Sequence, residues 1–154
     1  MKELLTYRDD MLSALLGVVL EISAQVAVLP STAWHQPAHL GSTTPHFLLS
    51  HLRESEHQVY ACQLPRLLVE DTPTQTVFDD QAWMSSHYRP DEPASAIVEQ
   101  LVKLRRHELG WLRKLAPAGW SRLARHPWWG LHTLQWYVEM QLDETRQYHH
   151  QLAG

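Results

Sequence analysis

Residues 130–152 of the sequence read GLHTLQWYVEMQLDETRQYHHQL, and their spacing predicts one long α-helix. Residues suited to a buried face recur there at steps of three and four, which is the repeat of one side of a helix. They are Leu134, Val138, Gln141, Thr145, Tyr148 and Leu152. A polar seam runs beside them through Tyr137, Gln141, Glu144 and Tyr148. Polar groups that face the inside of a protein need hydrogen bonds, water or a metal, so this helix is a candidate for carrying a site.

Three earlier segments predict helices of similar length. Their apolar residues keep a helical period in residues 2–26, 45–69 and 91–115. Thr44 and Pro45 suit the N-cap and the first turn of the second helix, and Pro65 is expected to bend it near its end. No segment shows the alternation of a strand. The prediction is therefore an all-α four-helix bundle with long connections, at least one of which crosses the bundle, and residues 1–154 form a single domain.

The composition argues against several classes of partner. The chain of 154 residues has 13 Lys and Arg against 17 Asp and Glu, for a formal net charge of −4. It has no long basic run, so we expect no nucleic-acid partner. Its single cysteine, Cys62, excludes an internal disulfide and suits the cytoplasm. We expect no membrane association, because no stretch reads as apolar over the length that spans a bilayer and the first residues lack the order of a signal peptide.

Histidine and tryptophan are unusually frequent, with eleven and seven residues respectively. Many His residues can mean surface positions and ordinary polar contacts, or they can supply a metal site. The connection that follows the third helix carries Trp120, Arg122, His126, Trp128 and Trp129. These side chains could fasten the connection to the end of the bundle or line a pocket there, and both interpretations stay open.

Four stretches of the sequence carry a resemblance to a known family. Residues 49–56 (LSHLRESE) contain a His-Leu pair followed by acidic residues, and residues 78–83 (FDDQAW) contain an Asp-x-x-Ala-Trp pattern. Residues 120–134 contain Trp-x-Arg, His-Pro, a Gly and Thr-Leu in that order, and Gln151-Leu152 closes the last helix. These stretches follow the family's order over nearly the whole chain, and the chain resembles the DinB-like (DinB/YfiT) superfamily.

The resemblance implies a four-helix bundle, often a homodimer, with a divalent metal held near one end by three His. One of these ligands maps onto His51. The other two lie seven and three residues before the terminal Gln, at Glu144 and Tyr148, where this chain has no His. The expected site is therefore His51, Glu144 and Tyr148, with Zn, Ni, Fe or Mn as the metals that suit such ligands.

The same site has a metal-free interpretation, in which Glu144 accepts a hydrogen bond from His51 and Tyr148 completes a polar cluster between two helices. The expected rim of the pocket consists of Trp83, Trp120, Arg122 and His126.

Two functions follow from the resemblance. The first is a metal-dependent enzyme that resembles the family's thiol S-transferases, in which a metal lowers the pKa of a low-molecular-weight thiol. The second is a metal-free member that binds a small molecule or acts as a dimeric interaction module. The family name also implies a link with stress response. The sequence assigns no catalytic residue, and metal content is the property that separates the two functions.

Overall fold

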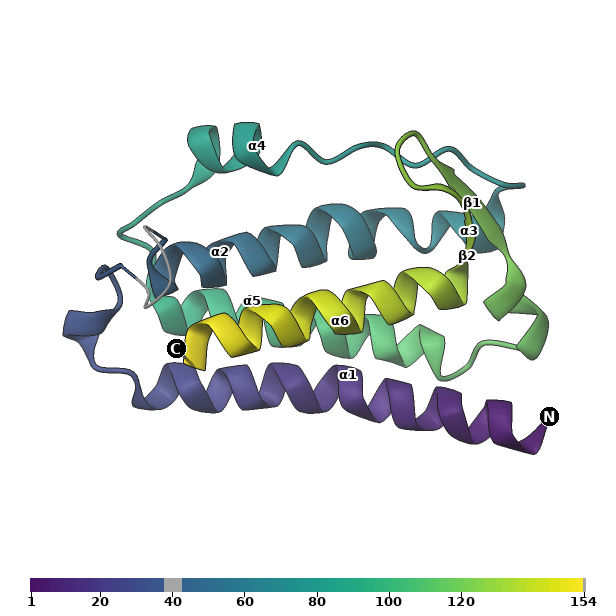
Figure 1. Cartoon of the computed structure of the whole chain (residues 1–154), viewed down its shortest axis with the longest axis horizontal. Coiled ribbons are helices and arrows are strands. Elements are labelled where there is room, and N and C mark those ends of the chain that lie inside the picture. The colour runs from purple at the N-terminus through teal and green to yellow at the C-terminus, as the bar shows by residue number, and fades with distance from the viewer. Residues whose placement is uncertain (38–42, 154) are drawn as a thin grey trace.

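A computed structural model describes residues 1–37 and 43–153, and its main feature is a bundle of four long helices (Figure 1). They are α1 (Lys2–Val28), α2 (Pro45–Ser55), α5 (Ala94–Leu112) and α6 (Leu134–Ala153). The shorter elements are η1 (Ser31–Ala33), the π-helical segment η2 (Glu56–Ala61), α3 (Arg66–Val69), α4 (Asp80–His87), η3 (Pro117–Ser121), β1 (Leu123–His126) and β2 (Gly130–Thr133). This architecture confirms the four-helix bundle predicted from the helical periodicity.

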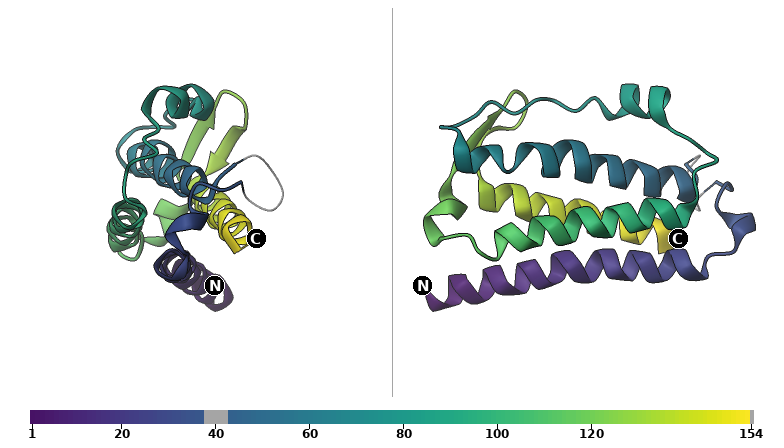
Figure 2. Two further views of the ribbon diagram at one scale, coloured as in Figure 1. Left: turned by 90° about the vertical axis from the view of Figure 1, so that its left-hand side faces the viewer. Right: turned by 180° about the vertical axis from the view of Figure 1, so that it is seen from behind.

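The connection between α3 and α5 crosses the length of the bundle. Helices α1 and α6 run in one direction, and α2 and α5 run in the other (Figures 1 and 2). After α3 the chain returns along the outer side of α2 through residues 70–93, which include α4, before α5 begins (Figure 1). Both α1 and α2 pack against α5 and α6. The expectation that at least one connection crosses the bundle is therefore confirmed.

The core of the bundle is apolar in the stretches that the helical period identified. Leu15, Val19 and Ile22 of α1 and Ile97 and Leu101 of α5 are fully buried. Burial of such side chains stabilises the fold by about 1.5–3 kcal/mol each, before the entropy cost of folding is counted. The four amphipathic helices are thus held together mainly by the apolar face that each of them presents to the others.

The second predicted helix is divided into three parts in the structure. It begins as expected, because the Thr44 hydroxyl caps it by accepting a hydrogen bond from the Phe47 N–H at 3.1 Å. The π-helical segment η2 then widens one turn and places Glu56 and Tyr60 inside the bundle, each 2% exposed. Pro65 precedes the short helix α3, where the sequence predicted a bend. The widened turn matters for the site, because it brings these two polar side chains next to α6.

A β-hairpin stands between α5 and α6, so the expectation that the chain has no strand is wrong at this point. Strands β1 and β2 pair in an antiparallel register from Leu123 with Thr133 to His126 with Gly130. The last helix consequently begins at Leu134 and not at Gly130. Gly130 has φ +82°, a left-handed conformation that glycine adopts readily at a tight turn. Strands of four residues are too short to show an alternating pattern, which is why the sequence did not reveal them.

Helix α1 is long and apolar enough, by composition alone, to cross a membrane. Its most apolar window of 18 residues has a mean hydropathy of 1.9, so the expectation that no segment reaches this level is wrong. The same helix packs against α5 and α6 and supplies a large part of the core. One third of the window (33%) is buried in the bundle. Length and hydropathy therefore do not distinguish a membrane segment from a bundle helix here.

Candidate functional site

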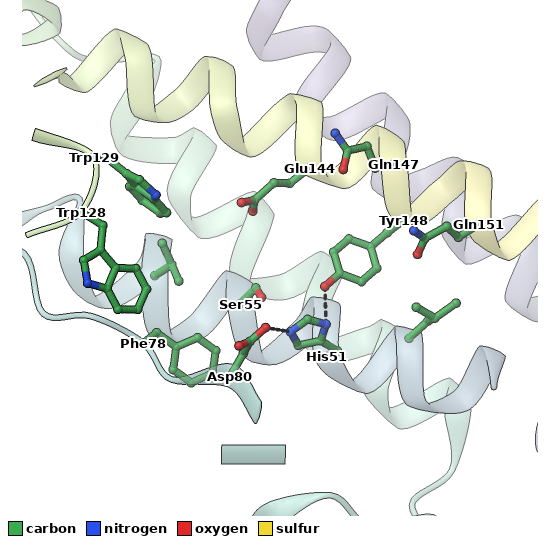
Figure 3. Close-up of a pocket in the computed structure, with 12 residues that line it drawn as sticks. His51, Ser55, Phe78, Asp80, Trp128, Trp129, Glu144, Gln147, Tyr148 and Gln151 are labelled. Atoms are coloured by element: carbon green, nitrogen blue, oxygen red, sulfur yellow. Dashed lines mark hydrogen bonds and ion pairs between the residues drawn. The ribbon is translucent and has the colours of Figure 1, made fainter. Parts of the chain in front are cut away.

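A cavity of about 490 Å³ lies between α2, α6, the returning segment beside α2 and the turn of the hairpin (Figure 3). His51, Glu144 and Tyr148 all line it, as the sequence predicted from the family pattern. The fold brings them together because α2 and α6 are antiparallel neighbours, so α2 lies beside the last turns of α6. Asp80, from the start of α4, lines the same cavity.

Both ring nitrogens of His51 are engaged by other side chains. Its Nε2 lies 2.9 Å from Oδ2 of Asp80, and its Nδ1 is hydrogen-bonded to the hydroxyl of Tyr148 (Figure 3). An ionised carboxylate can only accept, so the proton of the neutral imidazole lies on Nε2 and is donated to Asp80. Nδ1 is then the acceptor for the Tyr148 hydroxyl. The result is a continuous hydrogen-bonded chain from Tyr148 through His51 to Asp80.

The surroundings of Tyr148 keep its phenol protonated. Burial raises its pKa well above the ordinary value, and the nearby carboxylates of Glu144 and Asp80 raise it further. Both effects penalise a phenolate, since burial removes water from the charge and like charges repel. Tyr148 therefore keeps its proton and can donate it in the hydrogen bond to His51.

Glu144 is bonded to Tyr60 and makes no hydrogen bond with His51 among the residues that the structure describes. The Tyr60 hydroxyl donates to Oε2 of Glu144 at 2.7 Å. Burial raises the pKa of Glu144, and the carboxylate of Glu56 adds to this rise, whereas the bond from Tyr60 opposes it. Two other bonds replace the expected hydrogen bond between Glu144 and His51. The Tyr60 phenol of η2 binds Glu144, and the Asp80 carboxylate of α4 binds His51.

Behind the cavity a second polar cluster fills the middle of the bundle. Arg105 donates to both carboxylate oxygens of Glu56 at 2.9 Å and to the Thr145 hydroxyl at 2.9 Å. Gln141 Nε2 donates to Glu56 at 2.9 Å and to Glu108 at 2.6 Å. Burial and the neighbouring Glu56 raise the pKa of Glu108 well above the usual range. Of the polar seam predicted on the last helix, only Gln141 finds its partners in this cluster. Glu144 and Tyr148 are bonded at the cavity, and among the residues that the structure describes the buried Tyr137 hydroxyl has no hydrogen-bond partner.

Two residues expected at the rim of the pocket hold the hairpin connection onto the bundle instead. Trp120 is buried in the core, with 4% exposed, and the Arg8 guanidinium lies 5.2 Å from its ring centre. Arg122 donates to the backbone carbonyls of Leu67 at 2.7 Å and Glu70 at 2.8 Å. Neither side chain lines the cavity. The prediction that they form its rim is corrected: Trp120 packs the connection into the core beside Arg8 of α1, and Arg122 fastens it to the end of α3.

The other two expected rim residues, Trp83 and His126, also lie outside the lining of the cavity. Trp83 is part of α4 and stacks on His87, with ring centres 3.8 Å apart. His126 stabilises the hairpin turn, since its Nδ1 accepts hydrogen bonds from the backbone N–H groups of Trp128 at 3.1 Å and Trp129 at 3.2 Å. These two tryptophans, which follow His126 in the chain, are the ones that line the cavity.

Asp80 is the site residue that the sequence did not single out. It follows Asp79, whose side chain caps α4 by accepting from the Ala82 N–H at 3.0 Å. With the cap provided by Asp79, the carboxylate of Asp80 is free to reach His51. The available signal was the pair Asp79 and Asp80, because only one of them can be the N-cap of α4. The sequence could not show that the other carboxylate would contact His51.

The side chains of the cavity do not form a ligand set for a resident divalent metal. Within residues 1–37 and 43–153, no group of three or more His, Cys, Asp or Glu side chains is placed to hold one. Both nitrogens of His51 are used by Asp80 and Tyr148, and Glu144 is held by Tyr60. A protonated phenol is a poor metal ligand. The predicted positions share one cavity, but their chemistry suits hydrogen bonding better than coordination.

Among solved structures, the chain is similar to YfiT from Bacillus subtilis, which is described as a probable metal-dependent hydrolase with an unusual four-helix bundle topology. The TM-score is 0.83 at 20% sequence identity, and the match covers 95% of this chain and 83% of YfiT. No family model and no curated protein matches the sequence. The likeness confirms the fold implied by the resemblance to the DinB/YfiT superfamily.

Proposed function

We propose that this protein binds a small molecule in the cavity between α2 and α6, and that the chain of Asp80, His51 and Tyr148 replaces a metal as its polar centre. The observation that carries the proposal is the double engagement of His51, at Nε2 by Asp80 and at Nδ1 by Tyr148. A metal ligand needs one free nitrogen lone pair directed at the ion. Here the only lone pair of the neutral ring accepts the Tyr148 hydroxyl.

The cavity has the dimensions and wall chemistry of a small-molecule site. Its volume of about 490 Å³ lies within the range of about 300–1,000 Å³ that is usual for ligand pockets. Apolar and aromatic side chains make up about half of the wall and polar side chains the other half, so the pocket offers a ligand both apolar contact and several directed polar groups. The hydrogen-bonded chain fixes the positions of these polar groups, and fixed polar groups give a pocket its specificity.

Binding is favoured over nucleophilic catalysis by the state of Tyr148. The order of carboxylate, imidazole and hydroxyl is that of an acid–base triad, in which the hydroxyl becomes the nucleophile. A nucleophilic phenol needs a lowered pKa, whereas burial and two carboxylates raise the pKa of Tyr148. The same groups therefore hold a proton at the Tyr148 oxygen and present a fixed polar wall to a ligand.

The second candidate is a metal-dependent hydrolase or thiol transferase. It is favoured by the likeness in fold to YfiT and by the presence of His51, Asp80 and Glu144 around one cavity. It requires that a metal displace Tyr148 or Asp80 from His51 and draw Glu144 away from Tyr60. A thiol substrate would then meet a Lewis acid, which is the chemistry that the metal supplies.

Metal content and thermal melting distinguish the two candidates. We expect the protein, purified without chelators, to contain no stoichiometric transition metal and to melt at the same temperature with and without Zn²⁺, Ni²⁺ or Mn²⁺. The double variant Glu144→His/Tyr148→His should gain zinc or nickel binding. At a metal concentration of about 100 times Kd, this is about 2.7 kcal/mol of added stability and a rise of roughly 5–10 °C in Tm.

The matched control is His107→Ala, which removes an exposed imidazole from α5. A metal bound by the unaltered protein that is lost in His51→Ala and kept in His107→Ala would overturn the proposal and support the metal-dependent candidate. A double variant that binds no better than the unaltered protein would show that positions 144 and 148 do not surround a common point with His51.

A further inference from the structure

The turn of the hairpin holds two large aromatic rings at one side of the cavity. Trp128 is 72% exposed and Trp129 is 38% exposed, although most tryptophans in folded proteins are largely buried. Figure 3 shows both rings across the cavity from His51, with Phe78 of the returning segment near Trp128. Exposed rings grouped around a cavity are characteristic of a binding surface.

His126 fixes the position of this aromatic wall. Its ring stacks on Trp129 with centres 3.9 Å apart and an angle of 13° between the planes. Its Nδ1 also accepts the backbone N–H groups of Trp128 and Trp129. Since Nδ1 is an acceptor, the neutral ring carries its proton on Nε2. The two tryptophans are thus held at the cavity by contacts that do not depend on a ligand.

The cavity also carries negative charge, and His51, the basic side chain in its described lining, contacts Asp80 but not Glu144. Asp80 and Glu144 both line the cavity, and no Lys or Arg is among the lining residues within the part of the chain that the structure describes. In the same described part, no cationic side chain pairs with Glu144, whose carboxylate has only the Tyr60 hydroxyl as a partner. The carboxylates of Glu56, Asp143 and Asp80 lie close enough to add their negative charge to that of Glu144. A positive charge in the cavity would relieve this repulsion.

We propose that the cavity binds an organic cation, of the substituted ammonium class, whose charged head lies between the aromatic wall of Phe78, Trp128 and Trp129 and the carboxylates of Asp80 and Glu144. The aromatic faces attract a cation through their quadrupoles, and the carboxylates attract it through their charge. This inference rests on the proposed function, because it names the ligand class of the same cavity.

The wall chemistry disfavours other ligand classes. An anion would meet two carboxylates and, within the described lining, no Lys or Arg to pair with, which is strongly unfavourable in a partly buried site. A purely apolar ligand would cover Glu144 without offering it a partner, and covering an unpaired carboxylate is costly. An ammonium group attached to a short carbon chain satisfies both walls, and a methylated ammonium also makes close contact with the rings.

The inference is tested by a pair of probes that differ only in charge. Choline and 3,3-dimethylbutan-1-ol have the same shape, but only choline is cationic, and butylamine serves as a second cation. Calorimetric titration at neutral pH should show at least about tenfold tighter binding of choline than of the neutral alcohol, which corresponds to about 1.4 kcal/mol. Thermal melting of each protein sample confirms that it is folded.

Variants locate the binding. Glu144→Gln keeps the shape of the side chain and a hydrogen-bond acceptor for Tyr60, and it should weaken choline binding about tenfold with little effect on the alcohol. Glu99→Gln is the control, because it removes the same charge from an exposed position on α5. Trp128→Leu should weaken choline binding, and Trp128→Phe should restore most of it because the aromatic face is retained.

Equal binding of choline and the alcohol would overturn the cation inference and leave a small-molecule pocket in place. Failure of both choline and butylamine to bind at millimolar concentrations would also overturn it. A cation preference that survives both Glu144→Gln and Trp128→Leu would place the binding elsewhere and refute the assignment. The proposed function fails by a different measurement, namely stoichiometric metal held through His51.

Discussion

Replacement of Arg105 by methionine should destabilise the protein more than replacement of almost any other polar residue. The guanidinium is 0% exposed and makes four hydrogen bonds, to both oxygens of Glu56, to the Thr145 hydroxyl and to the backbone carbonyl of Leu15 at 2.6 Å. Arg105→Met keeps much of the apolar volume but leaves the buried Glu56 carboxylate without its cation. Breaking a buried pair in this way costs about 3–5 kcal/mol.

The cost should depend on pH in a defined direction. In the folded protein Arg105 lowers the pKa of Glu56 and thereby outweighs the effect of burial. A lowered pKa gives stability that is present above the ordinary carboxyl pKa and is lost as the pH falls through the folded-state value. Without Arg105, burial raises the pKa of Glu56, so folding at neutral pH requires uptake of a proton. The difference between variant and parent should therefore be largest at neutral pH and should shrink toward pH 5.

Urea denaturation at pH 7.5 and at about pH 5 measures the free energy of unfolding directly. The control is Arg106→Met, because Arg106 is the exposed neighbour of Arg105 and its loss should change stability by less than about 0.5 kcal/mol. Adding Glu56→Gln to Arg105→Met should recover a large part of the loss, since the uncompensated charge is then gone. A cost below about 1 kcal/mol, or a cost that grows as the pH falls, would refute this account of the core.

Three further changes test other parts of the fold by the same denaturation assay. Gly130→Ala should cost about 1–2 kcal/mol through backbone strain at φ +82°, because the added methyl group would meet no atom within 4 Å; a neutral result would mean that the turn relaxes. Thr44→Ala should cost about 0.5–2 kcal/mol by removing the cap of α2, and Thr44→Ser should restore most of it. Glu92→Gln breaks the paired contact with Arg53, at 2.6 and 2.9 Å. That contact lowers the pKa of Glu92, so it stabilises the fold only while the carboxyl is ionised. Glu92→Gln should therefore lower the free energy of unfolding by about 1 kcal/mol at neutral pH, and this loss should disappear as the pH falls below the ordinary carboxyl pKa. A loss that does not depend on pH would show that Glu92 contributes through packing.

The sequence predicted the helices well because each carries its own evidence. The apolar repeat of α1 and α6 needs no knowledge of their partners, and Thr44 with Pro45 marks the start of α2 by local chemistry alone. The hairpin was missed because its strands have four residues each, and its pairing depends on a turn at Gly130 that only the assembled chain reveals.

The site was predicted in part, because a family pattern gives positions but not contacts. It placed His51, Glu144 and Tyr148 around one cavity, and the structure brings them there. It could not show that Asp80 would reach His51, since these residues are 29 positions apart and belong to different elements. It also placed the rim at Trp120 and Arg122, whose side chains point into the core and toward backbone carbonyls.

The sequence by itself determined that four amphipathic helices would bury their apolar faces together, because helical periodicity is a local property of the chain. Only the tertiary structure decided which polar groups would meet. The antiparallel packing of α2 and α6 set His51 beside Tyr148, and the returning segment brought Asp80 to the other side of the ring. The physical reason is that hydrogen bonds and ion pairs act over a few ångströms, so they depend on the relative placement of elements that the linear order of residues does not specify.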